Sequence, residues 1–253
     1  MTLSIETIYR YPVKGLPGER LERADLVTDQ PLPQDRRFAI ARGTGLPGSD
    51  SDAWQPKSAF HQLEREERLA QLRPSFDADS GLLTLERHGR EVARGKASDP
   101  MGRALLNQFF GAFLGAGGPG TARLVEAKGF AFADVDEPLL SLVNLASVRD
   151  IERVAGRPID PRRFRANLYV EGPAAWEEEN WEGRVLTCGS LELEVLEPIE
   201  RCGATNVDPD TAARDMNLPL LLQRGFGHCH MGVYLRVRAG GSLAAGNSFT
   251  LKN

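Results

Sequence analysis

The sequence contains three cysteines, and Cys202 is the one whose neighbours suit reactive chemistry. It follows Arg201 and precedes Thr205, in the run 198–211 just past an alternating apolar segment at 191–195. A thiol with a pKa of about 8.5 becomes a nucleophile or a metal ligand when a nearby positive charge or a metal stabilises its anion. Cys202 is therefore a candidate thiolate on a loop. The alternative is a small buried apolar residue, which is a common role of a free cysteine.

Residues 163–170 carry the next set of side chains that could bind a ligand. Their alternation predicts a strand. One face of that strand consists of Phe164, Ala166, Leu168 and Val170, and the other of Arg163, Arg165, Asn167 and Tyr169. Two arginines and an amide on one face can hold an anion. The alternative is a solvated edge whose charges stay in water.

Two further clusters are weaker candidates for chemistry. His228, Cys229 and His230 are consecutive, but alternation sends the two histidines to one face and Cys229 to the other. Two ligands are too few for a closed zinc site, so we expect no zinc here. The acidic run 177–179 is expected to be a solvated face.

Composition excludes several classes of protein. With 41% hydrophobic and 26% charged residues, the 253-residue chain is typical of a soluble globular protein. Its net charge of −4 argues against nucleic acid as the main partner, because phosphate neutralisation needs clustered Lys and Arg. No apolar run approaches the roughly 18 residues of a membrane span, and the N-terminus lacks a signal-peptide pattern. An odd number of cysteines without a C-x-x-C arrangement suggests no disulfide framework, so we expect a reducing, cytoplasmic location.

The elements that must position these residues are mostly short strands, so the expected fold class is mainly β with a few helices. Strands are predicted at 3–13, 21–28, 37–42, 122–128, 184–188, 191–196, 231–237 and 247–251, with a hairpin around 79–81. Asp99 and Pro100 form the cap and first residue of a predicted helix, a second helix is predicted at 144–155, and a third begins at Pro219. The segment 42–52 is expected to be a surface loop, and the glycine-rich stretch 115–120 a domain junction.

Several motifs together resemble the MOSC family, a domain found at the C-terminus of molybdenum cofactor sulfurases and in amidoxime-reducing molybdenum enzymes. The most specific match is the run 201–211, which reads RC-x-x-T-x-V-D-P-x-T. Further matches are Y-P-V-K-G at 11–15, D-R-R-F at 35–38, R-F-R-A-N at 163–167 and W-x-G at 181–183. The resemblance covers nearly the whole chain. It implies an N-terminal MOSC β-barrel domain at 1–115 and a MOSC β-barrel domain at 120–253.

The resemblance also implies a molybdenum cofactor (molybdopterin) and roles for the motif residues. Cys202 would be the catalytic residue, as the protein ligand of molybdenum or the carrier of a persulfide sulfur. The implied cofactor contacts are Lys14, Arg36 and Arg165 to the phosphate or pterin, Asn167 by hydrogen bonding, and Thr205 and Asp208 from the cysteine motif. Arginine suits this task because its planar fork makes paired hydrogen bonds to phosphate.

Two functions are compatible with this resemblance. In the first, an oxidoreductase reduces small N-hydroxylated substrates, and its electrons come from a separate reductase or ferredoxin-like protein, because the sequence has no iron–sulfur cysteine set. In the second, Cys202 carries a persulfide to another enzyme or handles the cofactor. The predicted N-terminal barrel with Lys14 and Arg36 favours the first function, since a sulfur carrier does not need them. A third option is another anionic ligand bound in the same cleft.

Overall fold

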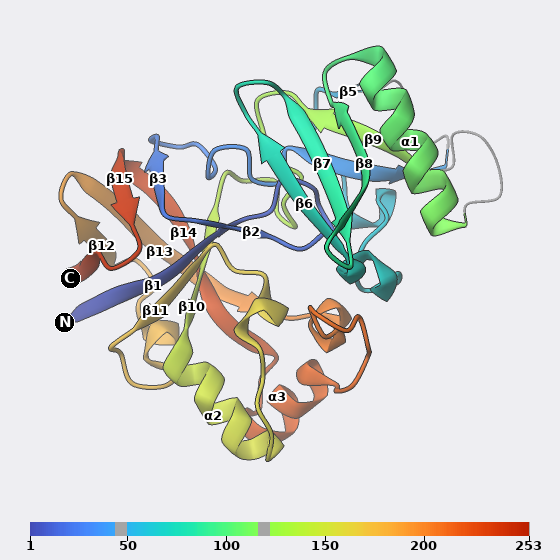
Figure 1. Cartoon of the computed structure of the whole chain (residues 1–253). Coiled ribbons are helices and arrows are strands. Elements are labelled where there is room, and N and C mark those ends of the chain that lie inside the picture. The colour runs from blue at the N-terminus through green and yellow to red at the C-terminus, as the bar shows by residue number, and fades with distance from the viewer. Residues whose placement is uncertain (44–49, 116–121, 253) are drawn as a thin grey trace.

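The computed structural model describes residues 1–43, 50–115 and 122–252. Within them, the chain is mainly β with three α-helices, which confirms the predicted fold class (Figure 1). Most of the predicted loop at 42–52 and of the glycine-rich stretch at 115–120 lies outside the described residues. None of the helices in the described ranges has the length and apolar content that a membrane span needs.

Seven strands close into a barrel that makes up the larger part of the molecule. Its strands are β1 (Thr2–Arg10), β10 (Leu140–Asn144), β11 (Leu168–Glu171), β12 (Val185–Cys188), β13 (Leu191–Glu200), β14 (His230–Ala239) and β16 (Ser248–Lys252). They follow the order β11-β10-β14-β13-β12-β16-β1, and the pairing of β1 with β11 closes the ring. Only β10 and β11 run parallel among these pairs; the other ladders are antiparallel.

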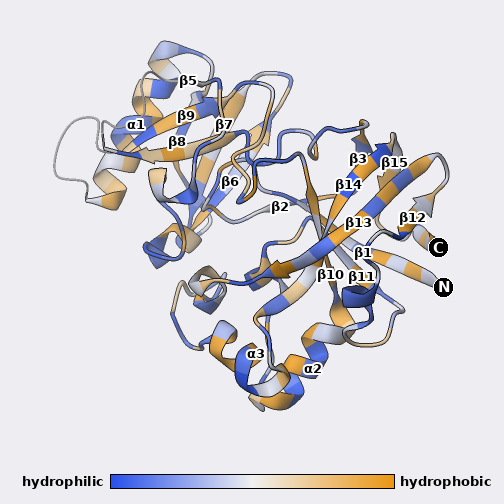
Figure 2. Cartoon of the chain, turned by 180° about the vertical axis from the view of Figure 1, so that it is seen from behind, coloured by the Kyte–Doolittle hydropathy of each residue, from blue (hydrophilic) through white to orange (hydrophobic). Residues whose placement is uncertain are grey.

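Alternation along the strands builds the core of the barrel. In β13, Leu191, Leu193 and Val195 are buried while Glu192 faces solvent, so apolar and charged side chains take opposite faces. The same alternation is visible as changing colour along β13 and β14 in Figure 2. These sequence patterns therefore predicted both the strands and the side that each turns toward the core.

A second, smaller body contains two three-stranded sheets. One is built from β4 (Phe38–Arg42), β9 (Ala122–Ala127) and β5 (Asp50–Ser51), and the other from β6 (Leu72–Asp77), β7 (Leu82–Arg87) and β8 (Arg90–Lys96). Helix α1 (Pro100–Leu114) packs against β8 and β9. Its cap is as predicted, because the Asp99 carboxylate accepts a hydrogen bond from the amide of Gly102 at 2.8 Å. Phe110 is fully buried in the core of this body.

The two bodies exchange segments of chain. The first strand, β1, lies in the barrel between β16 and β11, and β2 (Glu19–Leu21) extends the same sheet. Strand β3 (Arg23–Leu26) pairs with β15 (Gly241–Ala244) near the other end of the sequence. In the opposite direction, β9 pairs with β4 in the smaller body. Residues from both sides of 115–120 are thus joined within single sheets.

Helices α2 (Leu145–Ala155) and α3 (Leu218–Phe226) lie side by side against the barrel (Figure 1). Helix α2 agrees with the helix predicted at 144–155; the side chain of Asn144 caps it, and Gly156 ends it in a left-handed conformation. Short 3-10 helices complete the description: η1 (Lys57–Ala59), η2 (Glu67–Gln71), η3 (Pro161–Phe164), η4 (Glu177–Asn180) and η5 (Gly203–Asn206).

The strand predicted at 163–170 is wrong in its first half. The Asp160 side chain caps η3, Pro161 stands in its first turn, and Arg165 then takes a left-handed conformation with φ 53°. Strand β11 begins only at Leu168. The strict alternation of faces therefore fails, and Arg163 and Arg165 point to different surroundings.

The expectation of a solvated acidic face at 177–179 is also wrong. Glu178 is fully buried, where its carboxylate accepts hydrogen bonds from Ser147 Oγ at 2.7 Å and Asn144 Nδ2 at 3.0 Å. Burial raises the pKa of this carboxyl, and the two donors oppose that shift. Glu178 thus fastens η4 to the start of α2.

Candidate functional site

Cys202 lies on a loop just past a strand end, as the sequence predicts. Strand β13 ends at Glu200, and Cys202 is the residue that precedes helix η5. The amide and the hydroxyl of Thr205 both donate to the carbonyl of Cys202, at 3.2 and 2.9 Å. The thiol is partly exposed and is not in a disulfide. Thr205 therefore holds the backbone turn that presents the thiol.

A cavity of about 230 Å³ opens beside Cys202, where the barrel meets the smaller body. The predicted site residues that line it are Lys14, Arg36, Arg165, Asn167, Cys202 and Thr205. They come from segments that are distant in sequence. Asp208 is the predicted residue that is not among the lining residues.

Arg36 and Arg165 share one aromatic ring. Their guanidinium carbons lie 4.9 and 4.6 Å from the ring centroid of Tyr11, which is a favourable cation–π arrangement. Burial raises the pKa of Tyr11 to about 12, against the effect of both cations, so the ring stays neutral. Tyr11 is thus a platform that supports two positive charges at the cavity.

The partners of these two arginines differ. Arg36 forms an ion pair with the buried carboxylate of Asp35, and its Nη2 donates to the carbonyl of Arg165 at 3.1 Å. Burial opposes the charge of Arg36, but Asp35 raises its pKa above the usual value. For Arg165, the described residues provide no ion pair and no hydrogen bond to its guanidinium. Burial lowers the pKa of Arg165, and Arg36 adds to that shift, so an anion beside it would be stabilised.

Lys14 is a third cation of the cavity. Its side chain is 7% exposed, and Nζ donates to the carboxylate of Asp134 at 2.5 Å and the carbonyl of Phe132 at 3.0 Å. Burial lowers the pKa of Lys14, and Asp134 opposes the shift. Although burial acts in the other direction, Lys14 lowers the pKa of Asp134 to about 2. The Asp134 side chain is 60% exposed, so a bound anion could take its place at Lys14.

Two more cations flank Cys202. Arg201 donates to the carbonyls of Phe164 and Met231, so its guanidinium ties the cysteine loop to η3 and β14. Lys57 also lines the cavity, with its Nζ 3.6 Å from the carboxylate of Glu64. Burial lowers the pKa of Lys57, but Cys202 and Glu64 raise it overall.

Asn167 lies in the cavity wall with most of its hydrogen-bonding capacity used. Its Oδ1 accepts from the amide and hydroxyl of Ser141 at 3.1 and 3.0 Å, and its Nδ2 donates to the carbonyl of Tyr9 at 3.2 Å. Nδ2 has a second hydrogen that can reach a ligand. Asn167 thus both joins β1 to β10 and offers one donor.

Asp208 lies behind the cysteine loop. One of its oxygens accepts from the amides of Asp210 and Thr211, and the other pairs with Arg163 at 2.9 Å. Arg163 is 3% exposed and pairs also with Asp215 at 2.8 Å. These contacts stabilise the turn that follows Cys202.

Sequence reasoning missed three residues of the site: Tyr11, Lys57 and Asp134. Tyr11 is part of the Y-P-V-K-G motif, which was a usable signal. Lys57 begins the three-residue helix η1 and Asp134 stands in an irregular segment, and no periodicity marks either residue. Their role depends on contacts that only the fold creates.

The donor set suits a phosphate-bearing cofactor with a soft metal ligand. Arg165 offers a guanidinium without a carboxylate among the described residues, and Lys14 and Arg36 add charge nearby. Cys202 offers a partly exposed sulfur at the same cavity, and thiolate sulfur is a ligand for soft metals. The residues present therefore fit a molybdenum cofactor.

Comparisons with known proteins find relatives that match parts of the chain. Human mitochondrial amidoxime reducing component 2 is 31% identical over 122 residues, which are 44% of this chain and 36% of that protein. Human molybdenum cofactor sulfurase is 39% identical over 56 residues, which are 22% of this chain and 6% of that protein. The chain spans less than half the length of either relative. Among solved structures, the YUAD protein from Bacillus subtilis aligns over 99% of this chain and 96% of that one, with a TM-score of 0.47 and 14% identity.

Two family models match the chain one after the other. Residues 2–111 match the MOSC N-terminal beta barrel domain, and residues 130–250 match the MOSC domain. Together they account for most of the sequence, and four of the five motifs that carry the resemblance contribute residues to the cavity wall. The chain therefore belongs to the family of MOSC-domain proteins that carry the N-terminal MOSC β-barrel domain.

Proposed function

We propose that the chain is an oxidoreductase that holds a molybdenum cofactor and reduces small N-hydroxylated substrates. The observation that carries the proposal is the pairing, in one cavity, of the unpartnered Arg165 guanidinium with the Cys202 thiol. A phosphate would pair with the guanidinium of Arg165, and a soft metal would bind the thiol of Cys202. The similarity to an amidoxime reducing component and to a molybdenum cofactor sulfurase supports the same choice.

Each residue of the site has a proposed role in cofactor binding that follows from its charge and position. Arg165, Arg36 and Lys14 bind the phosphate end, and the Asn167 amide donates its free hydrogen to the pterin. Cys202 ligates the metal, Thr205 fixes the turn that presents it, and Asp208 supports that turn from behind. When bound, the cofactor supplies the two-electron chemistry that removes the substrate hydroxyl as water, with two protons and two electrons consumed.

The electrons come from a separate protein in this proposal. The described cysteines are single and partly exposed, and no dinucleotide fingerprint follows a strand in the sequence. The sequence therefore contains no motif that indicates a binding site for a hydride donor such as NADH. A reductase or ferredoxin-like protein would deliver electrons to the cavity.

The test uses purified protein loaded with molybdenum cofactor and follows conversion of an amidoxime to its amidine. We expect turnover with a reduced viologen dye and none with NADH alone. Cys202→Ser abolishes turnover, whereas Cys188→Ser and Cys229→Ser retain it, because neither thiol lines the cavity. Equal loss of turnover in all three variants would indicate that the cysteines have structural roles and would contradict the catalytic role of Cys202.

Sulfur carriage is the second candidate, and the position of Cys202 favours it. Cys202 is partly exposed and lines the same cavity as Lys57, so a sulfur-accepting partner could reach it. A carrier retains no molybdenum but accepts sulfur from a desulfurase. Purified protein without molybdenum, but with a persulfide on Cys202 in its mass spectrum, would replace the reductase proposal by this one.

A further inference from the structure

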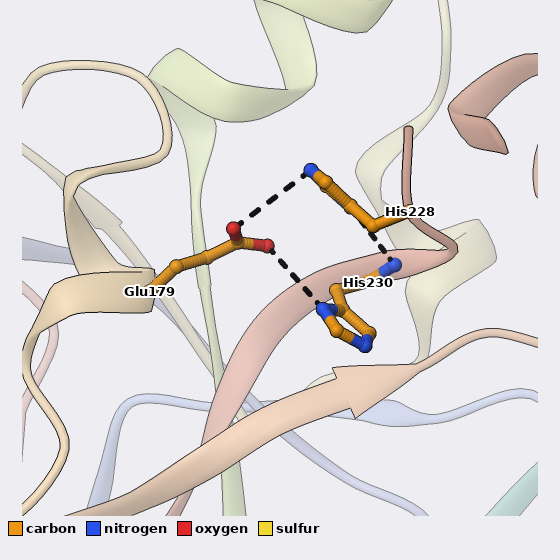
Figure 3. Close-up of side chains that lie close together, drawn as sticks. All are labelled: Glu179, His228 and His230. Atoms are coloured by element: carbon orange, nitrogen blue, oxygen red, sulfur yellow. Dashed lines mark hydrogen bonds and ion pairs between the residues drawn. The ribbon is translucent and has the colours of Figure 1, made fainter. Parts of the chain in front are cut away.

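A second group of ligand-type side chains lies outside the cavity. Glu179, His228 and His230 point toward one another, as Figure 3 shows. The Nε2 atom of His228 is 3.8 Å from one Glu179 oxygen, and the Nδ1 atom of His230 is 3.9 Å from the other. One ligand atom from each residue lies within 4.8 Å of the other two. The sequence predicted the two histidines on one face but not the carboxylate that joins them.

We propose that Glu179, His228 and His230 bind a divalent transition-metal ion such as Zn²⁺ or Co²⁺. Two imidazoles and one carboxylate are ligands that these ions accept, and water can fill the remaining positions. With metal–ligand bonds of about 2.1 Å, the ligand atoms of a tetrahedral site are separated by roughly 3.4 Å. The three ligand atoms lie within 4.8 Å of one another, so they need to approach each other by no more than about 1.4 Å.

The carboxylate of Glu179 supplies an independent reason to expect a ligand. Its Oε1 atom is buried, and it has no hydrogen bond. Buried polar atoms are nearly always bonded, so an orphaned oxygen between two imidazoles calls for a partner. In the described chain, the basic side chains within 4 Å of the Glu179 carboxylate are these two histidines, and no Lys or Arg competes for it.

The surroundings hold the three side chains in place. Glu179 belongs to η4, which the buried Glu178 fastens to α2. His228 follows Gly227, whose left-handed conformation ends α3, and His230 begins β14. The ring of Trp176 packs against His228 with centroids 5.2 Å apart. Glu179 and His230 thus lie on packed elements and His228 in the short connection between two of them, which limits the conformational freedom that is lost when an ion binds.

Cys229 is not part of this group. Its Sγ lies 3.6 Å from the carbonyl of Pro219 and 3.5 Å from Oε1 of Gln223, on α3. The alternation expected from the sequence therefore holds for the thiol. The sequence near His228 and His230 offers no third ligand on the same face. Glu179, from a distant segment, supplies that ligand.

Metal binding requires one proton to move. The amide of His230 donates to Nδ1 of His228 at 3.1 Å, so a neutral His228 carries its proton on Nε2. A metal on Nε2 shifts that proton to Nδ1 and ends the hydrogen bond from the amide. The start of β14 must therefore adjust when the ion binds, and His228 is the ligand that moves.

The experiment titrates Co²⁺ into the metal-free full-length chain. Bound cobalt quenches the fluorescence of Trp176 and gives visible absorption bands, and neither readout depends on enzyme activity. We expect one saturable equivalent in the wild type. Glu179→Gln and His230→Gln each weaken binding at least about tenfold, since even the loss of a supporting partner costs that much. Trp176→Phe reduces the quenching, because Trp181 at the end of η4 remains, and it leaves the absorption bands.

Matched controls separate this site from the cavity. His88→Gln changes an exposed histidine in a turn distant from Glu179 in sequence, and it should bind cobalt as the wild type does. Cys202→Ser and Cys229→Ser should do the same. Thermal melting confirms that each variant is folded. Absence of saturable binding at millimolar cobalt, unchanged affinity in both ligand variants, or loss of the site in Cys202→Ser would each overturn the proposal.

Discussion

Arg163 and Arg165 are two positions apart, yet the fold treats their charges in opposite ways. Arg163 is buried against two carboxylates, those of Asp208 and Asp215, and also donates to a backbone carbonyl. Arg165 turns to the cavity, where its contact is the ring of Tyr11. The left-handed conformation of Arg165 separates them, because it sends the chain away from the direction set by η3.

The contrast distinguishes a charge that stabilises the fold from a charge kept for a ligand. A buried cation with carboxylate partners destabilises the protein when it is removed, because its partners are left without a counter-ion. A cation without a carboxylate already costs free energy in the folded state, and a bound anion recovers it. Stability and anion affinity should therefore respond to different members of this pair.

Replacement of the paired arginine has the largest expected effect on stability. Arg163→Ala leaves Asp208 and Asp215 close together without their shared cation. We expect the free energy of unfolding to fall by about 2–4 kcal/mol, below the value for a fully buried pair because both acids are partly exposed. Urea unfolding measures it.

The control for this change is the neighbouring arginine. Arg162 pairs with Asp160 and Asp210 at the surface, and its side chain is 36% exposed. Arg162→Ala should cost no more than about 1 kcal/mol. Equal losses in the two variants would remove the distinction between a buried cation and a surface one.

Replacement of the unpartnered arginine should affect binding instead. Arg165→Ala keeps a non-glycine residue at the left-handed position, so the backbone cost is unchanged, and stability should shift by less than about 0.5 kcal/mol. Affinity for inorganic pyrophosphate should fall about ten- to a hundredfold, since hydrogen bonds to a charged group contribute roughly 1.5–3 kcal/mol. Calorimetric titration and thermal melting measure the two quantities.

Arg165→Lys sharpens this prediction. Lysine keeps the charge but lacks the planar fork, so it should recover part of the pyrophosphate affinity and not all of it. A sharp drop in melting temperature with unchanged pyrophosphate affinity would show that Arg165 stabilises the fold as Arg163 does, and would contradict the contrast between the two residues.

The smallest expected effect comes from the acid that competes with the anion. Asp134→Asn frees Lys14 from its ion pair, so pyrophosphate should bind about three- to fivefold more tightly at low salt, a gain of ~0.6–1 kcal/mol. The gain should shrink as salt is added, because the carboxylate is largely exposed. Asp136→Asn removes an exposed acid two positions away and should change little. A weaker binding of pyrophosphate by Asp134→Asn would mean that the acid positions Lys14.

Regular alternation and caps were the features that the sequence could predict. Strands β1, β13 and β14 follow period-two patterns, and α1 begins at the expected cap. The position of Cys202 past β13 followed from the same patterns, since a strand must end before the next polar run. In these segments local preference and burial agree, so the pattern alone is informative.

The rest depended on contacts between distant segments. No local pattern marks Arg165, a non-glycine residue, as left-handed, so alternation continued the strand too far back. Glu178 and Glu179 look like solvated acids until η4 packs on α2 and β14. Asp134 meets Lys14 only because the fold joins segments that are 120 residues apart in the sequence. Sequence patterns therefore predict a charged side chain to be exposed when its partner is distant in the sequence.

The closure of the barrel by β1 has a consequence for how the chain folds. Ser4 pairs with Ser248 on one side and with Glu171 on the other, so the ring cannot close until residues near both ends have met. Such long-range pairings make folding slow, because the entropy of closing long loops is lost before the contacts form. A fragment that begins after β9 would leave β11 and β16 with open edges, which invite pairing with other molecules. Refolding of that fragment should therefore yield aggregates, and a β1 peptide supplied in excess should reduce them.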